Sequence, residues 1–238
     1  EVTISHGWRI RHRGFVNQAL VVTRVAELRD RISRAGGIGV GIVAVTKTFG
    51  IDAWNDAKFA GCEAVGENYA QELIAKSQQV DRVERLPVHF VGQLQTNKIK
   101  SLFDIVDVWQ SVDRASVVTE LVKRQTARTS AGRCEILVQV NTTSEMDKGG
   151  CDPTEVETLV EQARKGGLDV TGLMTVGPTD MDSGKTRAAF RLLKQMASDL
   201  GVEQLSMGMT ADVEIAVEEG STLVRVGTAL FGKRPHSI

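Results

Sequence analysis

A lysine follows the first strongly apolar, β-branched run of the chain, in the order Val43-Ala44-Val45-Thr46-Lys47. At the end of a buried strand, an amine is partly desolvated, which disfavours its ammonium form and makes it a usable nucleophile toward a carbonyl. Position alone favours an ordinary solvated lysine, because most lysines are surface residues. Lys47 is therefore a candidate for Schiff-base chemistry if other segments supply the rest of a site.

Two later segments have the composition of an anion-binding site. One is Ser206-Met207-Gly208-Met209-Thr210, which precedes a helix expected to begin at Ala211, and the other is Val226-Gly227-Thr228. Small hydroxyl residues, glycines that permit close backbone approach and N–H groups at a helix start together favour a phosphate. The alternative interpretation is a pair of ordinary helix caps.

Arg225 lies inside the apolar run Thr222–Val226. A buried guanidinium is costly unless it is paired or hydrogen-bonded. We therefore expect a partner, either a carboxylate such as Glu67 or Asp212 or a ligand acceptor near the end of the strand. An aldehyde for Lys47, a phosphate for the two loops and a ring nitrogen for Arg225 together describe pyridoxal phosphate (PLP), for which an arginine partner of the ring nitrogen is a recognised arrangement.

The elements that must position these residues alternate between strand and helix. Apolar runs predict strands over 40–46, 63–66, 88–92, 105–111, 135–141, 170–176, 204–209 and 222–226. Amphipathic stretches predict helices over 17–35, 52–60, 69–79, 96–103, 113–127, from 152, over 183–200 and over 211–219. This alternation predicts an α/β fold, a single (β/α)8 TIM barrel with an extra N-terminal helix and a core of about 17–232.

An open doubly wound sheet is the alternative fold, but the turn Lys47-Thr48-Phe49-Gly50 lacks the dinucleotide fingerprint. In a barrel, chemistry lies at the carboxyl ends of the strands, and phosphate sites follow strands seven and eight. Asn68 falls at such an end and could donate to a ligand oxygen or cap a helix. His89 alternates with apolar neighbours, and we expect it to face the barrel interior as a core histidine.

Five segments, in this order along the chain, resemble the YggS/PROSC family of PLP-homeostasis proteins, which are alanine racemase N-terminal-domain-like. They are Ala44–Thr48, Gly66–Glu72, His89–Lys98, Ser206–Asp212 and Val224–Gly232. The resemblance extends from about Asn17 to Gly232, nearly the whole chain. Thr46 and Thr210 stand where serine is commoner in the family, and both keep the hydroxyl.

The resemblance implies the barrel of alanine racemase, PLP fold-type III. It also implies a covalent aldimine at Lys47, Arg225 opposite the pyridine nitrogen and phosphate contacts from the two loops. The candidate cofactor-binding residues are Lys47, Asn68, His89, Ser206, Gly208, Met209, Thr210, Arg225, Val226, Gly227 and Thr228.

Three functions remain open at this stage. The first is storage or delivery of PLP in intracellular PLP homeostasis, with PLP-dependent apo-enzymes as partners. The second is a weak PLP-dependent racemase or lyase, and the third is a Schiff-base aldolase acting on a sugar phosphate. Racemases of this fold take one base from a tyrosine of a second domain, whereas this chain ends at Ile238, soon after the last strand, and its one tyrosine is Tyr69. We therefore expect a carrier.

Composition narrows the remaining classes. The chain has 238 residues and a formal net charge of −1, so nothing in its electrostatics favours nucleic acid or an anionic membrane. The three cysteines and four histidines have no zinc or disulfide spacing: Cys62, Cys134, Cys151, His6, His12, His89 and His236. Without a membrane-length apolar run or a signal peptide, and with cysteines that suit reduced thiols, we expect a cytoplasmic protein. Without the dimerising domain of the racemases, we expect a monomer. The loop 142–150 is expected to be a mobile lid.

Overall fold

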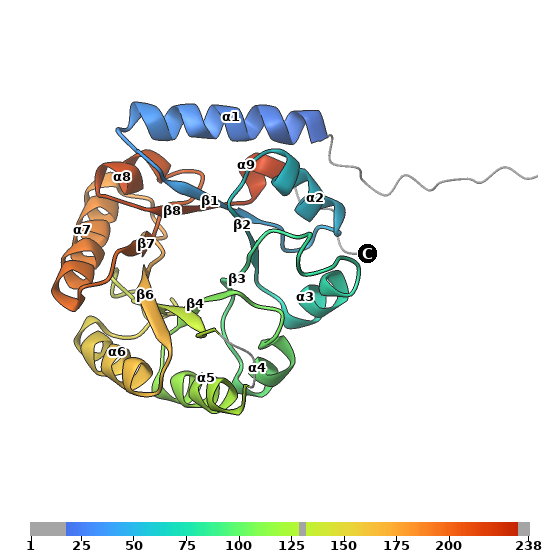
Figure 1. Cartoon of the computed structure of the whole chain (residues 1–238). Coiled ribbons are helices and arrows are strands. Elements are labelled where there is room, and N and C mark those ends of the chain that lie inside the picture. The colour runs from blue at the N-terminus through green and yellow to red at the C-terminus, as the bar shows by residue number, and fades with distance from the viewer. Residues whose placement is uncertain (1–17, 129–131, 233–238) are drawn as a thin grey trace, which may run out of the picture.

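Eight parallel strands close into a barrel in chain order, as the computed structural model shows for residues 18–128 and 132–232 (Figure 1). The strands are β1 (Gly41–Val45), β2 (Ala64–Glu67), β3 (Val88–Phe90), β4 (Val108–Val112), β5 (Glu135–Gln139), β6 (Asp169–Met174), β7 (Gln204–Ser206) and β8 (Leu223–Val226). β8 pairs with β1 over the register Gly41–Leu223 to Ala44–Val226, which closes the ring. The predicted (β/α)8 barrel is confirmed.

Helices surround the barrel, and most follow a strand. They are α2 (Asp52–Phe59), α3 (Ala70–Ser77), α4 (Thr96–Leu102), α5 (Ala115–Ala127), a 3-10 turn (Pro153–Glu155) continuing into α6 (Val156–Lys165), α7 (Ser183–Leu200), α8 (Val213–Glu218) and α9 (Thr228–Phe231). The core lies between the outer faces of the strands and these helices, where apolar side chains from both layers form one continuous cluster. Among the buried polar side chains, Arg225, Ser206 and Gln110 are hydrogen-bonded to one another. A second, small apolar cluster of Val108, Leu137 and Met174 is separate from the main core.

The extra N-terminal helix is α1 (Gln18–Arg34), which lies outside the barrel and packs against α2, α8 and α9 (Figure 1). It buries Val21, Val25, Leu28 and Ile32, a stripe with helical spacing. The predicted start of this helix at Asn17 lies outside the described residues, as do His6, His12 and His236.

The predicted start of the helix after β7 at Ala211 is wrong, because α8 begins at Val213. The Asp212 carboxylate accepts the Met209 N–H at 2.6 Å, which closes a turn before the helix can begin. β7 also ends at Ser206 rather than at Met209. The segment between β7 and α8 is therefore a loop at the carboxyl end of the barrel, where the site was expected.

Candidate functional site

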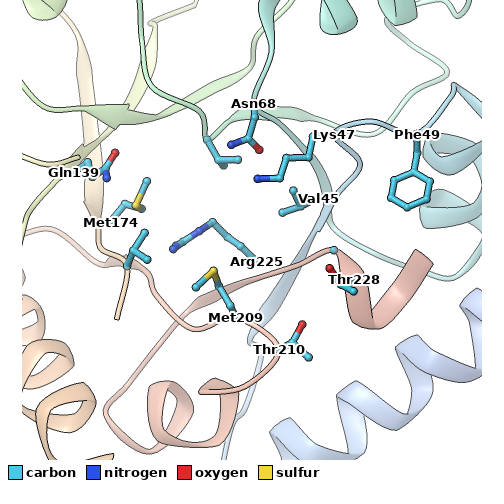
Figure 2. A pocket seen from close by; sticks show the side chains of 13 residues that line it. Val45, Lys47, Phe49, Asn68, Gln139, Met174, Met209, Thr210, Arg225 and Thr228 are labelled. Carbon is cyan, nitrogen blue, oxygen red and sulfur yellow. The ribbon is translucent and has the colours of Figure 1, made fainter. Parts of the chain in front are cut away.

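A cavity of about 270 Å³ lies at the carboxyl ends of the strands, in the mouth of the barrel (Figure 2). Its lining comes from the ends of several strands and the loops that follow them: Val45, Lys47, Phe49, Asn68, Val91, Gln139, Met174, Val176, Met209, Thr210, Arg225, Gly227 and Thr228. Figure 2 shows the Lys47 amine and the Arg225 guanidinium directed into the same hollow, with Asn68 beside Lys47. The cavity thus unites residues more than 170 positions apart in sequence, since they range from Val45 to Thr228.

The structure brings together most of the residues predicted from the sequence. Those that line the mouth cavity are Lys47, Asn68, Met209, Thr210, Arg225, Gly227 and Thr228. Four others are absent from its lining: His89, Ser206, Gly208 and Val226. Val226 is fully buried in β8 and pairs with Ala44 of β1.

Ser206 and His89 belong to a chain of hydrogen bonds that crosses the inside of the barrel. Arg225 Nη1 donates to Ser206 Oγ at 2.7 Å, and Ser206 Oγ donates to Gln110 Oε1 at 2.7 Å. Gln110 Nε2 then contacts His89 Nδ1 at 2.5 Å. His89 is buried, as expected of a core histidine, and it borders a second cavity formed by the amino ends of the strands. Ser206 therefore supports Arg225 from below the mouth.

Arg225 is only 5% exposed, and it donates to two neutral acceptors. Besides the Ser206 hydroxyl, it reaches the Thr175 carbonyl oxygen at 2.7 Å. Burial lowers the pKa of Arg225 to about 10, and the Asp212 carboxylate opposes this shift. A guanidinium has five N–H donors, so Arg225 can offer further donors to a ligand in the cavity that it lines.

The predicted carboxylate partner of Arg225 is therefore only partly correct. Asp212 acts on Arg225 through its charge. Glu67 was the wrong candidate, because its carboxylate pairs with Lys76 at 2.6 Å, away from Arg225. Glu67 is the last residue of β2, and its side chain contacts Trp54 of α2 and Lys76 of α3, so it faces the helix layer. In a strand buried on both faces, the sequence pattern alone does not show whether a residue faces the helices or the barrel interior.

Asn68 presents a polar atom that the protein itself leaves unpaired. Its Oδ1 is buried and has no hydrogen-bond partner among the described residues. The Asn68 backbone lies directly against Gly92, where an added Cβ would lie 2.2 Å from the Asn68 carbonyl oxygen. An unsatisfied buried polar atom is costly, so this wall of the cavity suits a ligand with a polar group.

The loops after β7 and β8 form the other wall. Gly227 lets β8 end close against β1, since an added Cβ would lie 3.0 Å from the Val45 carbonyl oxygen. Thr228 begins α9, and the first N–H groups of a helix have no intrahelical acceptor. In the loop after β7, the Met209 N–H donates to the Asp212 carboxylate. Of the loops after β7 and β8, the one at Gly227 and Thr228 is thus the better anion-binding site.

Several lining residues were missed by the sequence analysis. They are Val45, Phe49, Val91, Gln139, Met174 and Val176. Gln139 had a usable signal, because it is a polar residue near the end of the apolar run 135–141. The apolar residues had none, since apolar strand ends are equally common in a closed core. The loop 142–150 contributes no residue to this lining. Its mobility remains a prediction.

Other features bear on function classes. Among the described residues, no cluster of three or more His, Cys, Asp or Glu side chains could hold a metal ion. No helix in that part of the chain is long and apolar enough to cross a membrane. The three cysteines are buried and free, and burial raises the pKa of each thiol to about 12.

Comparison with known proteins adds independent findings. The family model of the alanine racemase N-terminal domain matches residues 17–235. The pyridoxal phosphate homeostasis protein of Pseudomonas aeruginosa is 34% identical over 223 residues, covering 92% of this chain and 95% of that protein. The human protein of the same name is 34% identical over 212 residues, covering 82% and 77%. The structure of PipY from Synechococcus elongatus with PLP bound matches with a TM-score of 0.78 and 30% identity, covering 89% and 100%.

Proposed function

The chain belongs to the alanine racemase N-terminal domain family and, within it, to the pyridoxal phosphate homeostasis proteins, and on this premise we propose that it binds PLP in intracellular PLP homeostasis. The observation that carries this proposal is the convergence of Lys47, Arg225 and the Gly227-Thr228 turn on one cavity. The Lys47 amine suits an aldehyde, and the Arg225 guanidinium, which only donates hydrogen bonds, suits a ring nitrogen. The Gly227-Thr228 turn suits a phosphate.

Each part of PLP has a residue that would hold it. PLP supplies an aldehyde when it is bound, and the Lys47 amine would attack that carbon, form a carbon–nitrogen double bond and release one water. Arg225 would donate to the ring nitrogen and keep it unprotonated, because a guanidinium has no acceptor. Gly227 and Thr228 would receive the phosphate, with Thr210 nearby, and Asn68 would meet a polar group on the ring.

Storage or delivery fits this cavity better than fast catalysis. A two-base racemase needs a second base opposite the lysine. Tyr69, which precedes α3, is about half exposed and is not among the lining residues of the mouth cavity. An unprotonated ring nitrogen also weakens PLP as an electron sink. We propose PLP-dependent apo-enzymes as recipients, and a monomer located in the cytoplasm, where buried, reduced cysteines are ordinary.

An absorbance titration with PLP tests the binding proposal. The purified protein should give the visible band of lysine-bound PLP, and Lys47→Ala should abolish it. Lys98→Ala is a matched control, since this lysine lies at the same end of the barrel but lines a different cavity. A band that persists in Lys47→Ala, or that Lys98→Ala removes, contradicts the assignment.

The Arg225 contact has its own spectroscopic test. Arg225→Glu replaces a donor with a group that can share a proton with the ring nitrogen, so the band of bound PLP should shift. An unchanged spectrum in a variant that still binds PLP contradicts the contact. To separate carrier from weak racemase, single amino-acid enantiomers are incubated with the loaded protein and analysed by chiral chromatography. Turnover of about one per second or faster contradicts a pure carrier.

A further inference from the structure

The turn that carries Lys47 has a conformation that its own sequence disfavours. The Thr46 carbonyl oxygen accepts the Phe49 N–H at 3.1 Å, so Lys47 and Thr48 are the two central residues of a β-turn. Thr48 has a φ of 70°, in the left-handed region that glycine or asparagine normally occupies at this turn position. A β-branched residue is strained there, so other parts of the structure must hold the turn in place.

Helix α3 supplies two contacts that hold the turn, one on each side of Lys47. The Glu72 carboxylate accepts the Thr48 N–H at 2.8 Å. The Lys76 ammonium donates to the Thr46 carbonyl oxygen at 2.8 Å. Glu72 and Lys76 are four residues apart and so lie on the same face of the helix. The backbone groups that flank Lys47 are therefore both fixed by a single helix face.

The Lys76 contact is anchored by a buried ion pair. Lys76 is 4% exposed and Glu67 is fully buried, and their charged groups are 2.6 Å apart. The same Glu67 oxygen also accepts the Thr46 hydroxyl at 2.6 Å and the Trp54 indole N–H at 2.9 Å. A buried ammonium cannot leave its carboxylate without a large desolvation cost, so Lys76 stays against the turn.

We propose that Glu72 and Lys76 are positioning residues for Lys47, which hold its turn so that the amine points into the mouth cavity. This inference rests on the proposed covalent attachment of PLP to Lys47. Neither residue lines the cavity, so neither is expected to touch PLP. Their loss should weaken the step in which Lys47 bonds the aldehyde and leave unchanged the docking of the phosphate and the ring.

A double-mutant cycle with PLP as the probe separates these two effects. Glu72→Ala is made in the parent chain and in Lys47→Ala, and the dissociation constant of PLP is measured for all four proteins. In the parent chain the variant should weaken PLP binding about tenfold or more, which is the scale of a lost hydrogen bond to a charged group. In Lys47→Ala it should change the constant little, because no covalent bond remains to be positioned.

Two conservative variants sharpen the test. Glu72→Gln keeps an oxygen that can accept the Thr48 N–H and should bind PLP nearly as the parent does. Thr48→Gly should rescue Glu72→Ala, since glycine takes a φ of 70° without strain and needs no support.

Glu63→Ala is a matched control, because Glu63 binds a residue near the amino end of β1, whereas Lys47 follows the carboxyl end of β1. Its carboxylate accepts the Ile42 N–H of β1 at 2.7 Å, so its removal costs β1 a similar contact far from Lys47. PLP affinity should be retained in this variant. Equal weakening by Glu63→Ala and Glu72→Ala would overturn the inference.

The remaining outcomes are also decisive. Glu72→Ala that weakens PLP equally in the parent and Lys47→Ala backgrounds would overturn the inference, since Glu72 would then shape the cavity rather than position the lysine. No weakening in either background would overturn it as well. Failure of the proposed function looks different: the parent chain would then not bind PLP, or Lys47→Ala by itself would bind PLP as tightly as the parent.

Discussion

His89 is held as a neutral imidazole inside the barrel, and we predict that its protonation destabilises the fold as the pH falls. The residue is 7% exposed, and its Nδ1 lies 2.5 Å from Gln110 Nε2, a donor that requires an unprotonated nitrogen. Burial lowers the pKa of His89 from 6.5 to about 4, and the charge of Asp107 opposes part of this shift.

The sign and size of the effect follow from proton linkage. In the unfolded chain the imidazole has its ordinary pKa, so between pH 6.5 and pH 4 the unfolded state binds more protons than the folded state. The contribution is fully present above the unfolded pKa and is lost as the pH falls toward the folded one. At 1.36 kcal/mol per pKa unit, the whole window corresponds to about 3 kcal/mol. By pH 5, about 2 kcal/mol of this is lost.

Urea unfolding at pH 7.5 and at pH 5 measures this loss, with His89→Gln as the comparison. The glutamine keeps an amide oxygen that can accept from Gln110 but does not titrate. Other ionisable groups contribute to both proteins alike, so the parent should lose about 2 kcal/mol more than the variant between the two pH values. Parallel pH profiles of the two proteins would contradict the prediction, because His89 would then protonate as easily in the folded state as in the unfolded one.

Three further predictions concern buried groups. Lys76→Met leaves the buried Glu67 carboxylate without its cation, so it should lower the free energy of unfolding in chemical denaturation by about 3–5 kcal/mol. Adding Glu67→Gln should recover most of this loss, and an equal loss in the single and the double variant would contradict the ion pair. Gly92→Ala puts a Cβ 2.2 Å from the Asn68 carbonyl oxygen. It should therefore lower the free energy of unfolding by about 1–3 kcal/mol in thermal unfolding and weaken PLP binding in the absorbance titration. Unchanged PLP affinity would contradict a contact between Asn68 and PLP. The buried cysteines, each with a thiol pKa raised to about 12, should react with iodoacetamide at about pH 8 far more slowly in the folded protein than in urea, and equal rates would show that they are accessible.

The barrel was predictable because its signal is repeated along the whole chain. Each buried strand is a short apolar run and each helix has its own period, so errors at single boundaries do not change the count. The boundary error at Ala211 has a local cause, since the Asp212 side chain closes a turn that no periodicity reveals. The positions of Lys47 and Arg225 followed from the barrel, because strand ends meet at one face.

The partners of the buried charges were not predictable in the same way. Whether Glu67 meets Arg225 or Lys76 depends on which side of β2 it faces, and a strand buried on both faces carries no alternating pattern. The strain at Thr48 was equally invisible, since threonine is an ordinary residue in a sequence. Only its φ of 70° in the folded structure shows that the turn before α2 needs outside support.

Borohydride reduction of the PLP-loaded protein, followed by peptide mass spectrometry, shows directly whether Lys47 bonds PLP. Reduction makes the lysine–PLP bond permanent. We expect one phosphopyridoxyl adduct, on the peptide that contains Lys47, and none after the same treatment of Lys47→Ala. An adduct on another lysine of the parent chain, or no adduct at saturating PLP, would contradict the attachment of PLP to Lys47.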